Sequence, residues 1–480
     1  MLQHGFAISC VHLWMAVLPL FSLPLFAAER PHVILVMAND MGWGQTGYQG
    51  HPILKTPNLD AMAHNGLRFE RFYAGAATCS PTRATVLTGR SNDRTGVEDH
   101  GYALRLQEQV LPIAMRQAGY VTGHFGKWHL NGLRGPGVPI PKEDNHNPGA
   151  FGFDQWLSVS NFFDRDPVLS RQGTWEEKTG DSSEIMVAEA LAFMDQHRHR
   201  GTPMFTVIWY GSPHSPFMAD PHDTAAFDDM DANSRNHYGE LVALDRSIGT
   251  LRTGLKDRQL AADTLLWFCS DNGGLPGIVP ETVGGLRGNK GTIYEGGLRV
   301  PGIIEWPAGI VSPRVTNFPA CTMDIFPTLA ELAGLAPHSM LQPQDGISLK
   351  PLLTRELVAR SKPIAFRQQG RAALVDNQFK LLTTNLAKAN FELYDLAEDP
   401  RETNDLWQAD PERGQRMLAT LLQWNQSVVA SIAGRDYPEG IVVEGDPVPR
   451  QWSTLPAYKD FLDIHGKRPE YRGLFKARQK

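Results

Sequence analysis

Two pairs of neighbouring oxygen-bearing side chains are candidate ligands for a hard metal ion. Asn39 precedes Asp40, and Asp271 precedes Asn272. Carboxylate and amide oxygens suit Ca²⁺ or Mg²⁺ and are a poor ligand set for zinc. The four side chains therefore predict a calcium or magnesium site, provided that the fold brings the two pairs together.

Basic side chains and imidazoles supply the other groups that chemistry on an anion needs. They are Arg83, Lys127, His129, His214 and Lys290. A hard cation, lysines and an arginine together would stabilise a tetrahedral oxyanion where its charge develops, and histidines can move protons near neutral pH. This combination indicates hydrolysis of a sulfate or phosphate ester.

Four apolar runs lead into these polar segments. They span residues 32–38, 119–125, 204–210 and 264–269. Their near-continuous hydrophobicity predicts strands buried on both faces, as in a parallel sheet, and residues 104–118 and 184–197 have helical patterns. Strands that alternate with helices predict a layered α/β domain, in which ligands bind beyond the carboxyl ends of the strands. We therefore expect the candidate residues to meet at one edge of the sheet.

The sequence pattern changes past residue 346. We expect a hairpin, a further strand and a helix there, over residues 372–375 with 379–382, 391–396 and 411–432. We therefore divide the chain into a catalytic domain, residues 29–345, and a smaller α+β subdomain, residues 346–480, which ends in a basic tail.

The longest apolar run lies at the N-terminus, in residues 6–28. Pro19 and Pro24 interrupt it, and small residues precede Glu29, as in a signal peptide, which we assign to residues 1–28. An uncleaved membrane anchor is the alternative. We expect export to the periplasm or out of the cell, without stable membrane insertion once the signal is cleaved.

The composition of the chain argues against nucleic acids as partners and against a disulfide-based scaffold. Lys and Arg number 46 against 52 Asp and Glu, so the net charge is −6, which argues against nucleic-acid binding through bulk charge. Without the signal peptide the cysteines are Cys79, Cys269 and Cys321. So few cysteines do not build a disulfide framework, and whether Cys269 and Cys321 pair stays open.

Residues 79–90, Cys-Ser-Pro-Thr-Arg-Ala-Thr-Val-Leu-Thr-Gly-Arg, resemble the signature of the formylglycine-dependent sulfatases. Further blocks similar to that family follow in its order, at residues 31–47, 126–130, 213–216, 270–273, 286–297 and 391–406. The likeness is to type I sulfatases of the arylsulfatase A or N-acetylgalactosamine-6-sulfatase kind, in the alkaline phosphatase superfamily. It implies an α/β fold with an alkaline-phosphatase-like mixed, largely parallel sheet flanked by helices, and a smaller C-terminal α+β subdomain.

The resemblance also implies a nucleophile. A separate formylglycine-generating maturation enzyme would convert Cys79 into formylglycine (3-oxoalanine). One hydroxyl of the hydrated aldehyde would attack sulfur, and the other would help to expel sulfate, which a thiol cannot do. We expect a helix over residues 83–89, whose dipole would favour the oxyanion.

The family assigns the remaining roles in the same way. Arg83 would hold the hydrate oxygen and the metal carboxylates. Lys127 and Lys290 would bind sulfate oxygens. His129 would be the base for the elimination, and His214, assisted by Lys290, would protonate the leaving alcohol.

The metal ion that the resemblance implies is Ca²⁺, favoured over Mg²⁺. Its ligands would be Asn39, Asp40, Cys79, Asp271 and Asn272, and Asp271 could also take the proton of the attacking hydroxyl. The family usually has paired aspartates where Asn39 and Asp40 stand. The Asn39 amide keeps an oxygen ligand but lacks a negative charge, so we expect weaker calcium binding.

The expected activity is removal of sulfate from a sulfated carbohydrate or an aryl sulfate. Two alternatives stay open: a formylglycine-dependent phosphodiesterase or phosphonate monoester hydrolase, and a non-catalytic, calcium-dependent glycan-binding protein. Some side chains on presumed cleft loops could either bind the sugar or pack the loops. They are His100, Tyr102, Trp156, Arg165, Trp175, His237 and Arg367.

Overall fold

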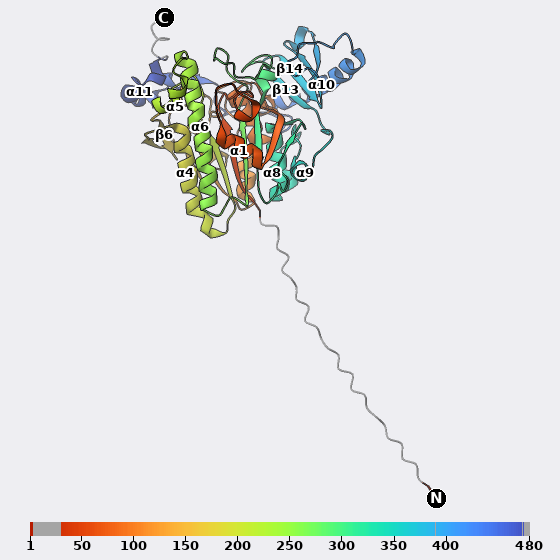
Figure 1. Cartoon of the computed structure of the whole chain (residues 1–480), viewed down its shortest axis with the longest axis horizontal. Coiled ribbons are helices and arrows are strands. Elements are labelled where there is room, and N and C mark those ends of the chain that lie inside the picture. The colour runs from red at the N-terminus through yellow and green to blue at the C-terminus, as the bar shows by residue number, and fades with distance from the viewer. Residues whose placement is uncertain (3–29, 389, 473, 475–480) are drawn as a thin grey trace. The chain divides into compact units, whose positions relative to one another are not determined.

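The computed structural model describes residues 1–2, 30–388, 390–472 and 474 (Figure 1). Apart from its first two residues, the predicted signal peptide lies outside the described residues, and so does the end of the basic tail. The described part of Pro31–Lys480 forms one compact unit. Within the described residues, no helix has the length and apolar character needed to cross a bilayer.

An eleven-stranded sheet runs through the described part of this unit. Its middle strands are parallel and lie in the order β9 (Thr264–Ser270), β1 (His32–Ala38), β8 (Met204–Trp209), β3 (Val121–Lys127) and β5 (Gln155–Val159). The outer strands are β10 (Arg299–Glu305), β2 (Leu67–Tyr73), β11 (Arg314–Thr316) and β12 (Ala320–Cys321) beyond β9, and β6 (Val168–Arg171) and β7 (Thr174–Glu177) beyond β5. The strands predicted from the four apolar runs are β1, β3, β8 and β9, so the prediction of a largely parallel sheet is confirmed.

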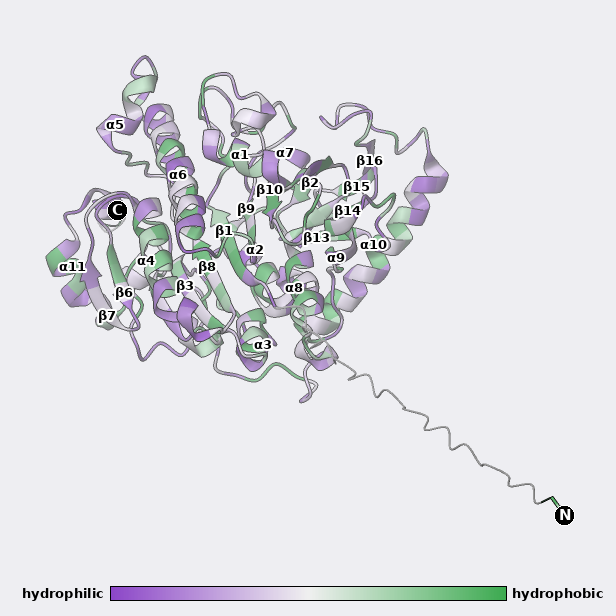
Figure 2. Ribbon diagram, turned by 60° about the horizontal axis from the view of Figure 1, so that its bottom comes forward, coloured by the Kyte–Doolittle hydropathy of each residue, from purple (hydrophilic) through white to green (hydrophobic). Residues whose placement is uncertain are grey.

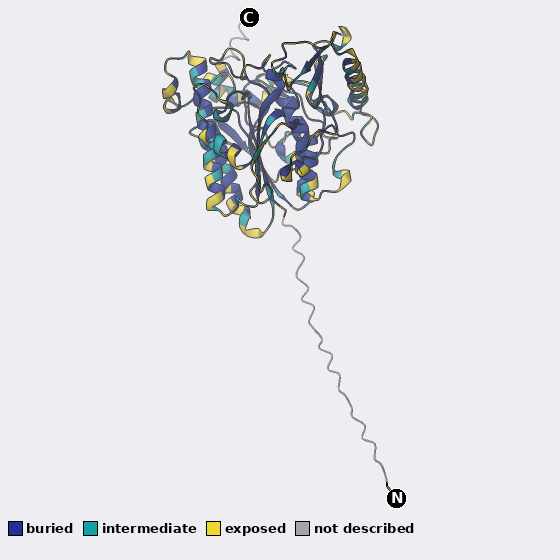
Figure 3. Ribbon diagram, turned by 45° about the vertical axis from the view of Figure 1, so that its right-hand side comes forward, coloured by how far each residue is buried: buried dark blue, intermediate teal, exposed yellow. Residues whose placement is uncertain are grey.

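Helices cover both faces of the sheet. Alternate side chains of a strand point to opposite faces. One core packs Val33 and Leu35 against helices α2 (Cys79–Thr88), α3 (Leu111–Gln117) and α8 (Ile325–Ala333). The other core packs Ile34 and Val36 against helices α1 (Pro57–Asn65), α4 (Ser182–His197) and α6 (Ala232–Asp257). Figures 2 and 3 show apolar and buried residues gathered on the central strands, which explains why the runs are apolar throughout.

Three helices begin at other residues than those predicted, and for α4 the difference is two residues, since it begins at Ser182. Helix α2 begins at Cys79, upstream of the predicted start, because Thr78 is extended and its carbonyl accepts the N–H of Thr82. It ends before Gly89, whose φ of 69° suits a glycine C-cap. The prediction of one helix over residues 104–118 is wrong in its first half. The N–H of Leu104 bonds to the carbonyl of Leu130, and α3 begins only at Leu111.

The predicted C-terminal elements are confirmed as a small antiparallel sheet with one covering helix. The sheet contains β13 (Ile364–Gln368), β14 (Arg371–Asp376), β15 (Phe379–Thr383) and β16 (Glu392–Asp395). Helix α10 (Pro411–Ile432) packs Met417 and Leu421 against Leu374 and Leu381 of that sheet. The opposite face packs against the large sheet, for example Phe366 against Tyr73. The boundary between residues 345 and 346 stays a prediction.

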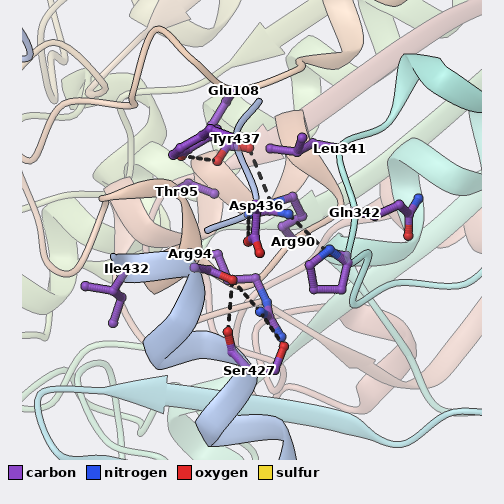
Figure 4. A network of polar contacts seen from close by, with 12 residues as sticks. Arg90, Arg94, Thr95, Glu108, Leu341, Gln342, Ser427, Ile432, Asp436 and Tyr437 are labelled. Atoms are coloured by element: carbon purple, nitrogen blue, oxygen red, sulfur yellow. Dashed lines mark hydrogen bonds and ion pairs between the residues drawn. The ribbon is translucent and has the colours of Figure 1, made fainter. Parts of the chain in front are cut away.

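A buried arginine network joins α10 to the segment that follows α2 (Figure 4). Nε and Nη2 of Arg94 donate to the two carboxylate oxygens of Asp345, at 2.8 and 3.1 Å. Nη1 of Arg94 donates to the hydroxyls of Ser427 and Ser431, at 3.0 and 2.6 Å. Arg90 pairs with Asp436 at 2.7 Å. Every nitrogen of the Arg94 guanidinium therefore has an acceptor.

The remaining elements are short. They are β4 (Leu133–Arg134), which pairs with β17 (Arg450–Gln451), and helices α5 (Pro221–Thr224), α7 (Glu295–Leu298), α9 (Lys350–Thr354) and α11 (Lys459–His465). Cys79, Cys269 and Cys321 are all buried free thiols, so Cys269 and Cys321 do not pair.

Candidate active site

The carboxyl ends of the parallel strands bring the predicted residues together. Asn39 and Asp40 follow β1, Lys127 ends β3, and Asp271 follows β9. The backbone N–H of Asp40 donates to Oδ1 of Asp271 at 3.0 Å, across two neighbouring strands. The expectation that segments far apart in the sequence meet at one edge of the sheet is therefore confirmed for these residues.

Asp40 lies at the centre of the cluster and is fully buried. Its φ of 66° is left-handed, a conformation that Asp tolerates better than most residues, and it directs the backbone N–H at Asp271. Nζ of Lys290 lies 2.6 Å from Oδ1 of Asp40, and Nδ2 of Asn272 donates to the same oxygen at 2.8 Å. Burial alone would lower the pKa of Lys290, but Asp40, Cys79 and Asp271 together outweigh burial and raise that pKa.

Arg83 joins the nucleophile helix to the other carboxylate. It lies one helical turn after Cys79 on α2, so the two side chains share a face. Its Nη2 donates to Oδ2 of Asp271 at 2.7 Å and its Nη1 donates to the carbonyl of Lys127 at 3.1 Å. The guanidinium carbon lies 5.0 Å from the ring centroid of Trp209, a cation–π contact beneath the site. Both charges of the Arg83–Asp271 pair are excluded from water.

Cys79 is the first residue of α2 and is 3% exposed. Burial lowers the pKa of Lys127 to about 8, and Cys79, Asp271 and Asp40 lie near enough to oppose that shift. Cys79 also raises the pKa of Lys290. The thiol therefore lies at the positive end of a helix and within electrostatic reach of two lysines, which is a place for a group that attacks an anionic ester.

Two imidazoles flank this position, and both have a pKa well below the ordinary histidine value. For His129 the causes are burial and then the charge of Lys127, and for His214 they are burial and then Lys290. Neither ring nitrogen of His129 has a hydrogen-bond partner among the described residues, although the side chain is buried. Nδ1 of His214 donates to the carbonyl of Ser215 at 2.6 Å, and its ring stacks on Phe162 with centroids 4.2 Å apart.

The oxygen ligands fit a hard cation. Oδ1 of Asn272 is buried and has no donor among the described residues, while its Nδ2 is used on Asp40 and Gly273. Oδ1 of Asn39 accepts a hydrogen bond from Nζ of Lys127 at 3.2 Å. No group of three or more His, Cys, Asp or Glu side chains in the described part of the chain could hold a metal. The two carboxylates and two amides of the predicted ligand set offer oxygen donors, which suit Ca²⁺ better than a transition metal, and Cys79 as a fifth ligand stays a prediction.

The C-terminal sheet contributes residues that the sequence did not predict. Nε2 of Gln368, at the end of β13, donates at 2.8 Å to the hydroxyl of Thr78, the residue before Cys79. Oε1 of Gln368 is buried without a partner among the described residues. Arg371 donates to the carbonyl of Gly291, next to Lys290. These contacts join segments 290 and 80 residues apart in the chain, so no local pattern could have indicated them.

Two of the presumed cleft-loop residues lie in the interior, so the expectation was wrong for them. Trp156 is buried in β5, and His237 is buried on α6, where its Nε2 lies 2.6 Å from Nε2 of Gln45. Trp156 packs in an apolar core, and the ring of His237 packs against Phe217. Arg165 and Arg367 form ion pairs with Asp220 and Asp93, and Trp175 packs against Phe461. The His100 side chain is exposed. It lies beside helix α2, since the N–H of the next residue, Gly101, donates to the hydroxyl of Ser80 on that helix.

Two protein family models match the sequence of this chain. A family model described as Sulfatase matches residues 31–335, more than half of the chain. The chain belongs to the sulfatase family. A second family model, described as N-sulphoglucosamine sulphohydrolase, C-terminal, matches residues 288–425 of this sulfatase.

Individual relatives agree with this assignment. The sulfatase is 32% identical to N-acetylgalactosamine-6-sulfatase of Sus scrofa over 390 residues, which covers 74% of this chain and 72% of that one. It is 34% identical to arylsulfatase A of Bos taurus over 385 residues, 71% of each chain. The crystal structure of Ps i-CgsB superposes with a TM-score of 0.73 at 25% identity, covering 82% of this chain and 92% of that chain. The predicted alkaline-phosphatase-like fold is confirmed.

Proposed function

We propose that this sulfatase removes sulfate from a sulfated saccharide, with a formylglycine made from Cys79 and a bound calcium ion. The observation that carries the proposal is the position of Cys79, at the start of α2, near Lys127 and Lys290 and one turn before the Arg83–Asp271 pair. The names of the relatives support a sulfate ester as substrate, and one of them names an amino sugar sulfate.

The protein's own side chains would divide the work of binding and proton transfer. Lys127 and Lys290 would bind the sulfate oxygens, because the first is fully buried and the second, partly exposed, lies 2.6 Å from the buried carboxylate of Asp40. His129 is neutral and has two unpartnered ring nitrogens, so it can accept a proton. His214 would donate a proton to the leaving alcohol. Binding of an anionic ester favours its charged form, and burial makes that form a strong acid.

The two groups that complete the site are Ca²⁺ and the aldehyde of modified Cys79. Asp40, Asp271, Asn272 and Asn39 would hold the ion. When bound, these groups supply positive charge for the sulfate oxygens and a hydroxyl nucleophile. We further propose that a maturation enzyme modifies Cys79 and that the protein is exported after cleavage of residues 1–28. Sequencing the N-terminus of the protein from its own cell would test cleavage of residues 1–28, and a start at Met1 would contradict it.

The test of the proposed function compares two ester classes on one preparation. The protein is produced with a competent maturation enzyme, and reaction with a hydrazide probe reports whether Cys79 carries an aldehyde. We expect labelling at Cys79, turnover of an aryl sulfate and of a 6-sulfated amino sugar, and slower turnover of the matched aryl phosphate. Cys321→Ala, which removes another buried thiol, is the control and should keep both labelling and turnover. Faster phosphate cleavage would reassign the enzyme to phosphoesters, and an unlabelled, inactive protein that still binds saccharide would contradict catalysis.

A further inference from the structure

The segment that carries Lys290 contains neither helix nor strand, although Lys290 is held close to Asp40. We call this segment, residues 286–294, the Lys290 loop, and all of its residues are described. Nζ of Lys290 lies 2.6 Å from Oδ1 of Asp40. Gly288 and Gly291 have φ values of 79° and 85°, and glycine leaves an isolated loop many conformations. The position of Lys290 therefore depends on contacts with the rest of the chain.

Both ends of the Lys290 loop are held by Glu402, in the segment that follows β16. Nη1 of Arg287 donates to the backbone carbonyl of Glu402 at 3.0 Å. At the other end, the N–H of Glu295 donates to Oε2 of Glu402 at 2.7 Å. The N–H of Gly296 also donates to the carbonyl of Arg287 at 2.8 Å, which brings the two ends together. One residue, 107 positions along the chain from Glu295, thus closes the base of the loop.

The Glu402 carboxylate is buried beside a second carboxylate, and a lysine lies between the two. Glu402 is 1% exposed and Glu295 is fully buried. Nζ of Lys380, on β15, lies 2.9 Å from Oε1 of each carboxylate. Oε2 of Glu295 accepts the Tyr73 hydroxyl at 3.1 Å and lies 3.8 Å from Nη1 of Arg299. Two negative charges are therefore matched by two positive ones, and loss of any one of them would leave a buried charge unbalanced.

The backbone of Glu402 adopts a conformation that glutamate seldom takes. Its φ is 56°, in the left-handed region, where a residue with a Cβ meets steric strain. Strained backbone persists where the surrounding contacts hold it, and such strain is concentrated at functional positions. In this conformation Glu402 presents its carbonyl to Arg287 and its carboxylate to the Glu295 N–H. The strained conformation thus allows one residue to contact both ends of the loop.

The middle of the Lys290 loop lies against two segments of the active site. The N–H of Lys290 donates at 3.0 Å to the carbonyl of Gly274, in the segment after β9. The N–H of Gly291 donates at 2.8 Å to the carbonyl of Ala77, just before α2. A base fixed at Glu402 keeps the loop where both bonds form and where the lysine side chain reaches into the site.

We propose that Glu402 is a positioning residue that holds Lys290 in place at the active site, and that Lys380 keeps the Glu402 carboxylate in position. Without that carboxylate, the Glu295 N–H loses its acceptor and the base of the loop opens. The Lys290 ammonium group then has no fixed position from which to bind a sulfate oxygen. The effect on turnover rests on the proposed function, because it requires Lys290 to bind the substrate.

The first test removes the Glu402 carboxylate or shortens its reach. Glu402→Ala should lower kcat/KM for an aryl sulfate about 10²-fold, as expected when a binding group moves by about 1 Å. Glu402→Asp keeps a charge for Lys380 and suits the left-handed backbone, but its shorter side chain withdraws from the Glu295 N–H. It should fold and still lose activity. Activity is expressed per formylglycine, measured with the hydrazide probe, so that incomplete maturation does not count as lost activity.

The second test asks for rescue at Lys380. Lys380→Met leaves the Glu295 and Glu402 carboxylates buried without the charge between them, and it should lower kcat/KM as Glu402→Ala does. In the Lys380→Met, Glu402→Gln double variant, the amide can accept from the Glu295 N–H and donate to the Glu295 carboxylate. This double variant should recover most of the lost activity.

A double-mutant cycle separates positioning of Lys290 from a general loss of structure. In Lys290→Ala the positioned group is gone, so Glu402→Ala should lower kcat/KM no further in that background. A general structural defect would lower kcat/KM by the same factor whether Lys290 is present or absent.

Hydrogen exchange tests the loop without any reaction. In Glu402→Ala and Glu402→Asp, amides of residues 286–297 should exchange about tenfold faster than in the wild type, as expected for loss of one hydrogen bond. Amides of β1 should not change. Lys178→Met is the matched control, because Lys178 also lies between two carboxylates, Glu176 at 3.1 Å and Glu189 at 2.9 Å, but is partly exposed. It should change neither kcat/KM nor the exchange of residues 286–297.

Three outcomes would overturn the proposal. One is an equal fall in kcat/KM for Glu402→Ala in the wild-type and Lys290→Ala backgrounds. Another is an unchanged exchange rate of residues 286–297 in both Glu402 variants. The last is faster exchange with unchanged kcat/KM, which would confine Glu402 to stabilising the loop. If the enzyme hydrolyses no sulfate ester, the exchange rates still decide whether Glu402 holds the loop.

Discussion

The Arg94 network and the active site both bury charged side chains, but they use their hydrogen-bonding capacity differently. In the network, each guanidinium nitrogen of Arg94 has an oxygen acceptor. Figure 4 shows one of these acceptors, Ser427. The active site contains buried polar atoms that have no hydrogen-bond partner among the described residues. They are Nε of Arg83, Oδ1 of Asn272 and both ring nitrogens of His129. A buried polar group without a partner costs about 1–3 kcal/mol.

The difference separates two uses of buried charge. At Arg94 no guanidinium nitrogen is left without an acceptor, so the contribution of this residue is to fasten α10 to the segment after α2. The active site keeps free ligands and imidazole nitrogens that only a metal ion, a substrate or water could satisfy. Changes in the network should therefore alter stability, and changes at the site should alter turnover.

The largest expected effect is at the nucleophile. Cys79→Ala should reduce kcat for an aryl sulfate by at least about 10⁴-fold, because the attacking group is lost. Its Tm should stay near that of the wild type, since only one buried sulfur is removed. Measuring both on protein matured in the same way tests the separation. Residual turnover within tenfold of wild type would place the nucleophile elsewhere.

The opposite result is expected for the network. Arg94→Met leaves the Asp345 carboxylate buried and unpaired, which should lower the free energy of unfolding by about 3–5 kcal/mol in urea titrations. The Arg94→Met, Asp345→Leu double variant should recover much of that loss. Arg413→Ala, which breaks a surface pair with Asp410 at the start of α10, is the control and should change the free energy of unfolding far less than Arg94→Met. If Arg94→Met lowers kcat and leaves the free energy of unfolding unchanged, the network serves turnover and not stability, which would contradict this prediction.

A substitution at His129 tests whether a buried side chain without hydrogen-bond partners contributes to turnover and not to stability. His129 has a φ of 57°, so asparagine is the substitution that the backbone tolerates. His129→Asn should lower kcat by about 10²–10⁴-fold, as expected for loss of a general base, with Tm unchanged or higher. His64→Asn on the surface should change neither. A Tm that drops together with kcat would give His129 a structural role.

Calcium affinity tests whether the free oxygen ligands of the active site bind a metal ion. Asn39→Asp adds a negative charge to the proposed ligand set and should tighten calcium binding by about tenfold, measured by calorimetric titration of metal-free protein. Asn65→Asp, on the exposed end of α1, is the matched control. Equal affinities for the wild type and Asn39→Asp would show that this position does not set calcium affinity.

The smallest expected effect is a pH dependence of the network. Burial alone would raise the pKa of Asp345, but the Arg94 guanidinium outweighs burial and holds that pKa below its ordinary value. The stabilisation is therefore present at neutral pH and is lost as pH falls below about 4, through the lowered pKa. Asp345→Asn should start from a lower Tm and lose less of it over that acid range in calorimetric scans. Parallel Tm profiles for the two proteins would show that the ion pair does not contribute.

Strands buried on both faces and one amphipathic helix could be predicted from the sequence. The apolar run 32–38 became β1, and the pattern over 411–432 became α10, because each segment carries its own burial pattern. The start of α3 was missed because the N–H groups of Leu104 and Arg105 bond to the carbonyls of Leu130 and Thr95, and local periodicity does not record such contacts.

The candidate site was predictable where chemistry is concentrated in motifs at strand ends. Asp40, Arg83, Lys127, Asp271 and Lys290 meet as expected. Phe162 and Gln368 were not predicted, because a stacking ring and an amide acquire their importance only from neighbours in space.

The hydrogen bond from Gln368 to Thr78 bears on how the saccharide preference of this enzyme could be re-engineered. Chimaeras that exchange the whole small sheet with that of a relative would also exchange the amide that steadies the residue before the nucleophile. Grafting only the β13–β14 turn, Gln369 and Gly370, would vary the rim and leave that support in place. Modular swaps of the subdomain should therefore carry a kinetic penalty that loop grafts avoid.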